Sequence, residues 1–225
     1  MDTSGGTALG IALQLLVLAS FAGVTARPLW ARAWRNPWPA LGAVVVIGLP
    51  SLAQFAWPGL GAALMRDPEA TCREGQWWRV LTALLAQDGG PAAAIFNLVV
   101  VALVLLAGTA AWGWWRALLL FVGCSVVLNL AALGWGPGGG TSFASDGLLM
   151  AVSARLALRG GRSLRWAAVA QVAAGVVLIA AGDAHGVALV LGFALGAALA
   201  AVNDGRGREL VSTREARSSS PAADS

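Results

Sequence analysis

Charged residues are scarce in this sequence, and those present are of few kinds. Only 12% of the 225 residues are charged, all 15 basic residues are arginine, and histidine occurs once. Because 58% of the residues are hydrophobic, one water-soluble core could not bury the apolar surface, so we expect the lipid bilayer to be the solvent. The net charge of +4 does not indicate nucleic-acid binding, since most arginines stand beside the ends of apolar runs, where membrane topology accounts for them.

Other scarcities exclude further classes of site and function. Cys72 lies in an expected loop and Cys124 in an expected helix, without metal-ligand spacing, so we expect neither a disulfide nor a zinc site. No other cofactor is expected. The sequence has no internal repeat and no series of charged residues through the middle of its apolar runs, which a transporter or channel would predict.

Seven apolar runs of 16 to 21 residues predict transmembrane helices, because about 20 helical residues cross the hydrocarbon core. They cover residues 6–26, 39–57, 91–111, 115–133, 141–158, 166–181 and 184–202. The expected fold is therefore an all-α, polytopic membrane helix bundle. Val24, Thr25 and Ala26 would also suit signal-peptide cleavage, but Asp2 and the lack of a leading positive charge favour an uncleaved first helix.

The arginines predict how the chain is oriented. Seven crossings leave twelve arginines on one side and three, Arg66, Arg73 and Arg79, on the other. By the positive-inside rule, the C-terminus is cytoplasmic and the N-terminus lies outside, in a multi-pass protein of the plasma (cytoplasmic) membrane. Residues 203–225 are rich in serine, alanine and charge, and we expect them to form a disordered cytoplasmic tail.

Tryptophans mark the ends of the predicted spans, where an amphipathic ring suits the headgroup region. Trp30, Trp34 and Trp38 recur every four residues, a spacing that fits a short helix lying on the cytoplasmic face. An ordinary loop with interfacial tryptophans fits this spacing equally well.

Few polar side chains lie inside the predicted spans, and each needs a reason because polar groups are costly in a bilayer. They are Asn97, Ser125, Asn129, Ser142, Ser145, Asp146, Ser153, Gln171 and His185. Ser142 and His185 each lie in the first turns of a span that runs from outside to inside, so they share a depth. A serine and a neutral imidazole at one level suit a nucleophile and its general base. They would also suit a hydrogen bond that holds two helices together.

The surroundings of this pair favour catalysis. Residues 134–140 form a glycine-rich lead into the helix of Ser142, where backbone N–H groups could face a developing oxyanion. After His185, the residues Gly192, Gly196 and Ala200 recur every four positions and form a small-residue face. Such a face lets another helix approach closely, and the helix of Ser142 is the candidate.

Residues 39–202 resemble the rhomboid family of intramembrane serine proteases, and two motifs of the first half carry the likeness. In the first external loop, Trp78, Arg79 and Thr82 resemble the family's tryptophan–arginine motif, which is structural. Asn97, in the outer part of the second core helix, is similar to the asparagine that helps to hold the oxyanion in that family.

Two more motifs follow in the second half, in the order that the family has. The run 140–142 resembles the start of the Gly-x-Ser-Gly motif, with Ser142 as its serine on the fourth core helix. Ala184 and His185, followed by Gly192, resemble the pattern on the sixth core helix. The resemblance implies a six-helix core over residues 39–202, preceded in 1–38 by an extra helix and its tryptophan- and arginine-rich segment.

The function that the resemblance implies is cleavage of single-pass membrane proteins near the outer leaflet. Ser142 would attack the peptide carbonyl, His185 would act as general base and acid, and Asn97 would help to stabilise the oxyanion. The expected partners are a transmembrane protein substrate and the lipid bilayer, with no nucleic acid.

Three departures from the family pattern keep a second hypothesis open. Phe143 replaces the second glycine of the serine motif, and Ala93 and Gln87 or Asp88 stand where active members usually carry histidines. An inactive relative that binds transmembrane clients is the alternative.

Asp146 is the third departure, because it stands where the family usually has an aromatic ring on the catalytic histidine. Because it lies one turn after Ser142, we expect it to hydrogen-bond His185 and orient it, as the acid does in a serine triad.

Overall fold

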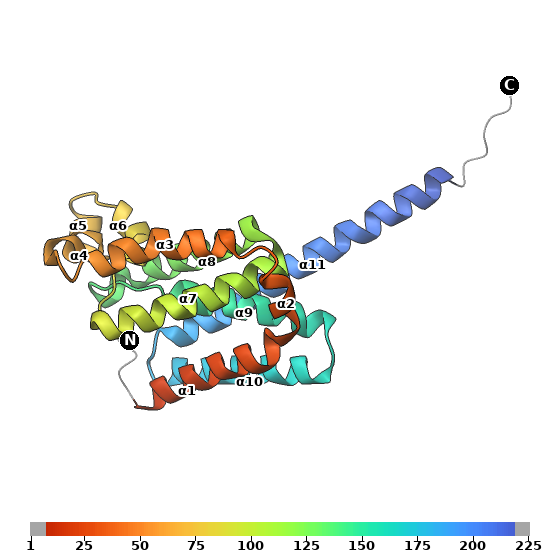
Figure 1. Ribbon diagram of the computed structural model, residues 1–225, viewed down its shortest axis with the longest axis horizontal. Coiled ribbons are helices and arrows are strands. Elements are labelled where there is room, and N and C mark those ends of the chain that lie inside the picture. Colours follow the sequence, from red (N-terminus) through yellow and green to blue (C-terminus); the bar gives the residue numbers. More distant parts are fainter. Residues whose placement is uncertain (1–7, 219–225) are drawn as a thin grey trace, which may run out of the picture.

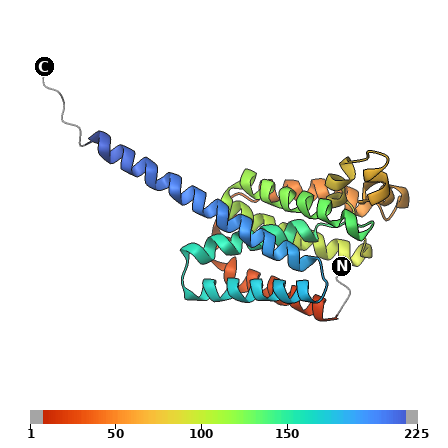
Figure 2. The ribbon, with the colours of Figure 1, turned by 180° about the vertical axis from the view of Figure 1, so that it is seen from behind.

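The computed structural model describes the backbone of residues 8–218 and the side chains of residues 8–203. This part of the chain is an all-α helix bundle without a β-strand (Figures 1 and 2). Its long helices are α1 (Ala8–Ser20), α3 (Trp38–Ala53), α7 (Gly90–Trp112), α8 (Trp114–Ala131), α9 (Ser142–Arg159), α10 (Arg162–Ala180) and α11 (His185–Ser218). Each of the seven predicted spans therefore corresponds to a helix.

The number of helices that could cross a membrane is lower than the seven predicted. Within the described part of the chain, five segments are long and apolar enough: Ala8–Thr25, Gly90–Trp112, Trp114–Trp135, Arg162–Ala180 and His185–Asn203. A sixth would be the pair Arg27–Ala33 and Trp38–Ala53, which is bent by 92°. α9 does not qualify because it carries Asp146, Arg155 and Arg159. The chain is nevertheless a multi-pass membrane protein.

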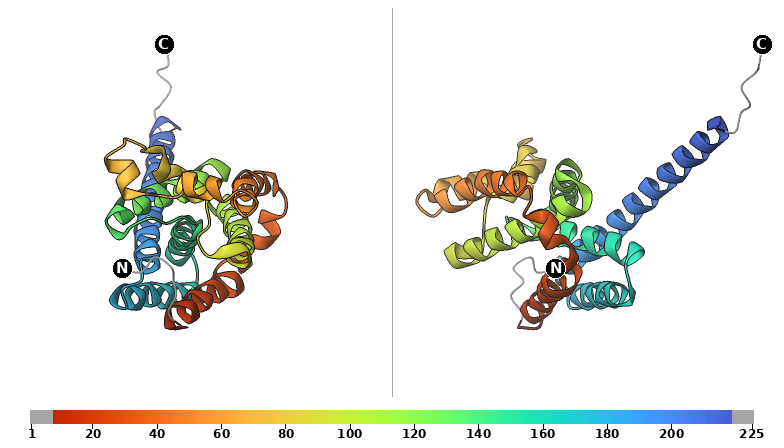
Figure 3. Two further views of the ribbon diagram at one scale, coloured as in Figure 1. Left: turned by 90° about the vertical axis from the view of Figure 1, so that its left-hand side faces the viewer. Right: turned by 45° about the vertical axis from the view of Figure 1, so that its right-hand side comes forward.

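Helix α9 lies in the middle of the bundle, against α7, α8, α10 and α11 (Figure 3, left). Twelve of its 18 residues are buried, so the protein rather than lipid surrounds most of its side chains. The outer helices instead expose large apolar residues, such as Leu16 of α1 and Leu49 of α3. This arrangement explains how α9 holds polar and charged side chains inside an otherwise apolar bundle.

Glycines allow α9 and α11 to lie in direct backbone contact. A Cβ atom at Gly192 or Gly196 would overlap the backbone of Gly147 or Ala151 of α9. The small-residue face predicted on α11 is thus its contact face with the helix of Ser142. On its other side, Gly147 packs on the buried Cys124, and both cysteines of the chain are free.

The N-terminal segment packs against α10 and ends in a sharp connection. α1 continues into a π-helical turn, η1 (Phe21–Thr25), and then into η2 (Arg27–Leu29) and α2 (Trp30–Ala33). The Nε1 atom of Trp30 donates a hydrogen bond to the carbonyl of Ala22 at 3.3 Å. α2 ends before Trp34, and Trp38 begins α3, so the three tryptophans do not share one helix.

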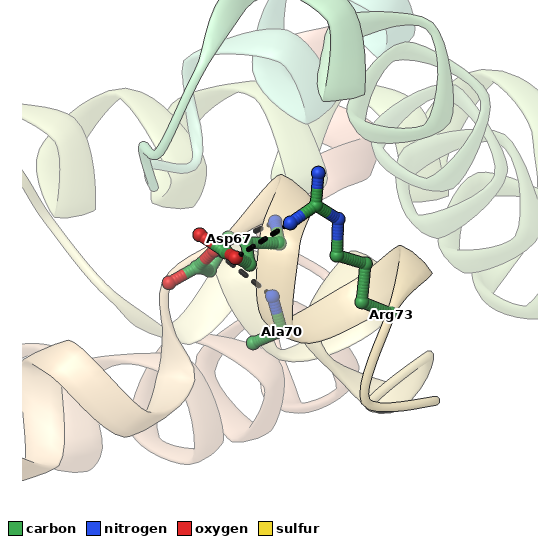
Figure 4. Close-up of polar contacts among 4 residues, drawn as sticks. Asp67, Ala70 and Arg73 are labelled. Atoms are coloured by element: carbon green, nitrogen blue, oxygen red, sulfur yellow. Dashed lines mark hydrogen bonds and ion pairs between the residues drawn. The ribbon is translucent and has the colours of Figure 1, made fainter.

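The segment between α3 and α7 folds into three short helices at one end of the bundle: α4 (Pro58–Leu64), α5 (Pro68–Cys72) and α6 (Trp78–Thr82). Asp67 caps α5, because its Oδ1 atom accepts hydrogen bonds from the backbone N–H groups of Glu69 and Ala70 at 2.9 and 3.2 Å (Figure 4). Arg73 extends from the end of α5 and pairs with Glu69 at 3.0 Å.

The tryptophan–arginine motif ties this segment together. Arg79 donates from Nη1 to the carbonyls of Ala62 and Met65 at 2.7 and 3.0 Å. Thr82 donates from Oγ1 to the carbonyl of Leu64 at 3.0 Å. These bonds satisfy carbonyls at the C-terminus of α4, which have no partner within their own helix. Trp78 is 56% exposed and lies outside this network.

Residues 203–218, for which the composition predicts a disordered tail, belong to helix α11 in the structure. α11 continues as a helix to Ser218 and projects away from the bundle (Figures 1 and 3). A helix that is already formed extends without a new nucleation step, and the arginine, glutamate, leucine and alanine of this segment are good helix formers. Residues 219–225 lie outside the described range.

Candidate active site

Three side chains form a hydrogen-bonded series at one end of the bundle. The Oγ atom of Ser142 lies 3.0 Å from Nε2 of His185. The Nδ1 atom of the same ring lies 2.7 Å from Oδ1 of Asp183. A carboxylate only accepts, so Nδ1 carries the proton and Nε2 is the acceptor for the serine hydroxyl. This tautomer suits a general base.

Two helix starts bring these residues together. Ser142 is the first residue of α9 and His185 the first of α11, and the glycine contacts described above hold these helices side by side. Asp183 lies in the turn that follows α10. Its Oδ1 atom also accepts a hydrogen bond from the backbone N–H of His185 at 2.9 Å. With side-chain exposures of 6% for His185 and 8% for Asp183, the pair is shielded from solvent.

The carboxylate that orients His185 is therefore Asp183, and the expectation for Asp146 was wrong. Both ring nitrogens of His185 are engaged, Nδ1 by Asp183 and Nε2 by Ser142. No ring nitrogen remains for Asp146. Asp183 was not singled out in the sequence because it lies between two predicted spans. An aspartate two residues before a helix start is, however, the typical signal of an Asx turn that caps the helix.

Phe143 supplies the aromatic neighbour of the histidine. Its ring lies 5.3 Å from the imidazole, centroid to centroid, with the planes tilted by 56°. The side chain is 6% exposed and packs with Leu128 and Ala184. The bulky residue beside the serine thus restricts the movement of the imidazole, while its ring also contributes to the wall of the cavity described next.

A cavity of about 460 Å³ adjoins Ser142 and His185. Three helices supply most of its wall: α1, the first half of α7 and the first turns of α9. Its apolar lining includes Ile11, Leu15, Leu18, Ala92, Phe96 and Leu149. Its polar lining includes Gln14, Arg66, Asp88, Asn97, Asn129, Ser145 and Asp146. An apolar space with a few polar groups at one place is typical of a ligand site.

Asn97 lines the cavity together with Ser142 and is held by a relay from α3. Its Nδ2 donates to Oε1 of Gln87 at 2.8 Å. The backbone of Gln87 exchanges two hydrogen bonds with the side chain of Gln54, at 3.1 and 3.3 Å. The side-chain carboxamide of Asn97 has two N–H donors, so one remains available in addition to the bond to Gln87. Ala93 adds only a methyl group to the cavity wall.

Arg66 holds the glycine-rich segment that leads to Ser142. Its backbone exchanges hydrogen bonds with Gly138 at 2.9 and 3.0 Å, and its Nε donates to the carbonyl of Gly136 at 3.1 Å. Its Nη1 donates to Oδ1 of Asn129 at 2.7 Å. The residue is 2% exposed; burial lowers the pKa of the guanidinium, and the Asp88 carboxylate opposes this shift. This contact could not be predicted from the sequence, where Arg66 was interpreted only as one of the charges that determine membrane topology.

Gly140 allows the glycine-rich segment before α9 to pass close to Ser142. Its φ of 157° is a backbone conformation that side chains rarely adopt, and its N–H donates to the carbonyl of Ala83 at 2.9 Å. The first backbone N–H groups of α9 follow directly, and they have no acceptor within the helix. A helix start that faces a cavity is suited to bind a developing negative charge.

Within the described residues, no group of three or more histidine, cysteine, aspartate or glutamate side chains could hold a metal ion. Comparison with known proteins found no matching family model, no matching curated protein and no matching solved structure.

Proposed function

We propose that this protein is an intramembrane serine endopeptidase, similar to the rhomboid proteases, that cleaves single-pass membrane proteins near the outer leaflet. The observation that carries the proposal is the series Ser142, His185 and Asp183 at the wall of a cavity. A bond that only joins two helices needs no carboxylate behind the imidazole and no space in front of the serine.

In this mechanism, Oγ of Ser142 attacks the carbonyl carbon of the peptide bond while Nε2 of His185 takes the hydroxyl proton. Asp183 stabilises the imidazolium that forms and keeps the ring in position. The proton then passes from Nε2 to the leaving amine, and the C–N bond breaks. A water molecule, activated by the same imidazole, hydrolyses the acyl-enzyme and restores Ser142.

The substrate carbonyl lies in the cavity between α1 and α7. Both helices present apolar side chains to that space, with Ile11 and Leu15 from α1 and Phe96 from α7 about half exposed. A transmembrane segment matches such walls. The end of the bundle with α4 to α6 holds three arginines, Arg66, Arg73 and Arg79, against twelve in the rest of the chain. By the positive-inside rule, this difference supports an outer position for the site and a cytoplasmic C-terminus.

Asn97 contributes a donor to the oxyanion. Replacement of Asn97 by alanine is expected to lower kcat by about 100- to 1000-fold with little change in KM, because the lost hydrogen bond forms only in the transition state. Steady-state cleavage of a single-span substrate would measure this. A rise in KM at constant kcat would instead place Asn97 in substrate binding.

The experiment that tests the proposed function is labelling of detergent-solubilised, full-length protein with a fluorophosphonate probe. The expected result is labelling of one serine, identified as Ser142 by mass spectrometry and absent from Ser142→Ala. The matched control is Ser153→Ala, which removes a buried hydroxyl from the same helix. Absence of labelling in protein that unfolds cooperatively would exclude an activated serine.

A second function is a catalytically inactive protein that binds transmembrane clients in the same cavity. The observation that favours it is Ala93, which adds only a methyl group to the cavity wall, so that Asn97 is the one side-chain donor that α7 offers the oxyanion among the described lining residues. It predicts binding of a single-span peptide without fluorophosphonate labelling.

A further inference from the structure

Asp146 is a charged side chain at the cavity that the proposed mechanism does not use. It lies one helical turn after Ser142 on α9 and lines the same cavity. Its Oδ2 atom is enclosed and has no hydrogen-bond partner among residues 8–203. A carboxylate oxygen without a partner in an enclosed, apolar setting is costly, so the structure leaves an interaction unmade.

Two more unused polar groups point to the same place. Ser145 is 2% exposed, lines the cavity and has no partner for its Oγ within the described side chains. Across the cavity, α1 brings in Gln14, whose Nε2 also lacks a partner there. Since buried polar groups in proteins are nearly always paired, this group of three is typical of a site that a ligand completes.

The charges around the cavity indicate which ligand. The titratable neighbours of Asp146 are His185 and Asp183, and these two already pair with each other. Arg66 is the one arginine among the described lining residues. Its Nε and Nη1 donate to Gly136 and Asn129, its Nη2 has no hydrogen-bond partner among the described residues, and the carboxylate that acts on its charge is Asp88. The cavity thus holds a carboxylate for which the side chains of residues 8–203 supply no dedicated cation.

We propose that Asp146, with Ser145, forms a subsite for a basic side chain of the substrate, close to the bond that is cleaved. A guanidinium presents several donors in one plane, which suits a carboxylate oxygen and a hydroxyl that lie on adjacent residues. The proposal rests on the proposed function for the role of Ser142 and adds the substrate class: membrane segments with an arginine or lysine beside the cleavage site.

The test uses binding, so that it does not depend on turnover. Full-length Ser142→Ala protein in detergent is titrated with single-span peptides that carry one arginine at successive positions of their outer third. Each peptide has a twin with citrulline, which keeps the shape of arginine without its charge. The expected result is binding at least about tenfold tighter for arginine than for citrulline at one position, a difference of about 1.4 kcal/mol.

Asp146→Asn, added to Ser142→Ala, is expected to reduce this preference to about twofold or less. Asp88→Asn is the matched control, because it removes the same charge from the same cavity lining. Its preference for arginine should persist. Equal binding of arginine and citrulline at all positions, or an unchanged preference in Asp146→Asn, would overturn the proposed subsite.

The outcome is separate from that of the proposed function. Labelling of Ser142 without any preference for arginine would support the proposed endopeptidase and contradict the proposed subsite. Preference for arginine without labelling would support the proposed subsite and indicate that it belongs to a client-binding protein without protease activity.

Discussion

Replacement of Asp183 by asparagine is expected to slow the reaction of Ser142 by about 100- to 1000-fold, while the protein stays folded. Oδ1 of Asp183 accepts both the backbone N–H and the Nδ1–H of His185, so an asparagine Oδ1 can keep the turn before α11 and the position of the ring. The neutral amide, however, no longer stabilises the imidazolium that forms when Nε2 takes the serine proton.

Single-turnover cleavage of a single-span substrate and the rate of fluorophosphonate labelling would both measure this loss. KM is expected to change little, and the thermal unfolding midpoint is expected to stay within about 4 °C of the original, a shift that corresponds to about 1 kcal/mol or less. A role in folding alone would lower the midpoint and leave the rate per folded molecule unchanged. That result would remove Asp183 from the mechanism.

Replacement of Gly192 by alanine is expected to separate α9 from α11 and to reduce both stability and activity. The added Cβ would overlap the backbone of Gly147, which cannot move as a side chain can. Overpacking of this kind costs about 2 kcal/mol. Because Ser142 and His185 stand at the starts of these two helices, a displacement of about 1 Å would also lower the labelling rate by about 100-fold.

The matched control is Gly123→Ala in α8. Apart from its chain neighbours and its own helix backbone, no described heavy atom lies within 4 Å of the Cβ position at Gly123. Alanine is also the better helix former, so this variant should be as stable as the original protein or more so. Unfolding midpoints in detergent and labelling rates of the two variants would be compared side by side. Equal behaviour would mean that the α9–α11 contact tolerates expansion and does not determine the geometry of the site.

The helices of the bundle could be predicted because their signal is local and strong. Apolar runs of about 20 residues, bounded by arginine, glycine or tryptophan, placed the starts of all seven within a few residues of those observed, although α11 continues beyond its predicted end to Ser218. The role of α9 was harder to predict, because its hydropathy alone does not reveal a central helix enclosed by others. The tail was predicted from composition alone, which does not account for the extension of an existing helix.

The site was predicted in part, for a physical reason. Ser142 and His185 could be paired because two helix starts at the same end of a bundle share a depth. The partner of His185 could not be chosen this way, since spacing along α9 favoured Asp146. The turn geometry that brings Asp183 under the ring is set by a hydrogen bond to the backbone of His185. Arg66 contacts Asn129 from 63 residues away, a relation that no local pattern carries.

Because other helices enclose α9, the geometry of the site should depend little on the thickness of the bilayer. Lipids of a longer or shorter chain length act on the helices that touch them, which respond by tilting at a modest energetic cost. α9 spans about 27 Å with its 18 residues and meets mostly protein. At its far end, the guanidinium of Arg155 lies 4.4 Å from the centroid of the Trp112 ring and anchors α9 to α7. Hydrophobic mismatch is therefore absorbed by the outer helices, and the chemistry at Ser142 should proceed at similar rates in thin and thick membranes.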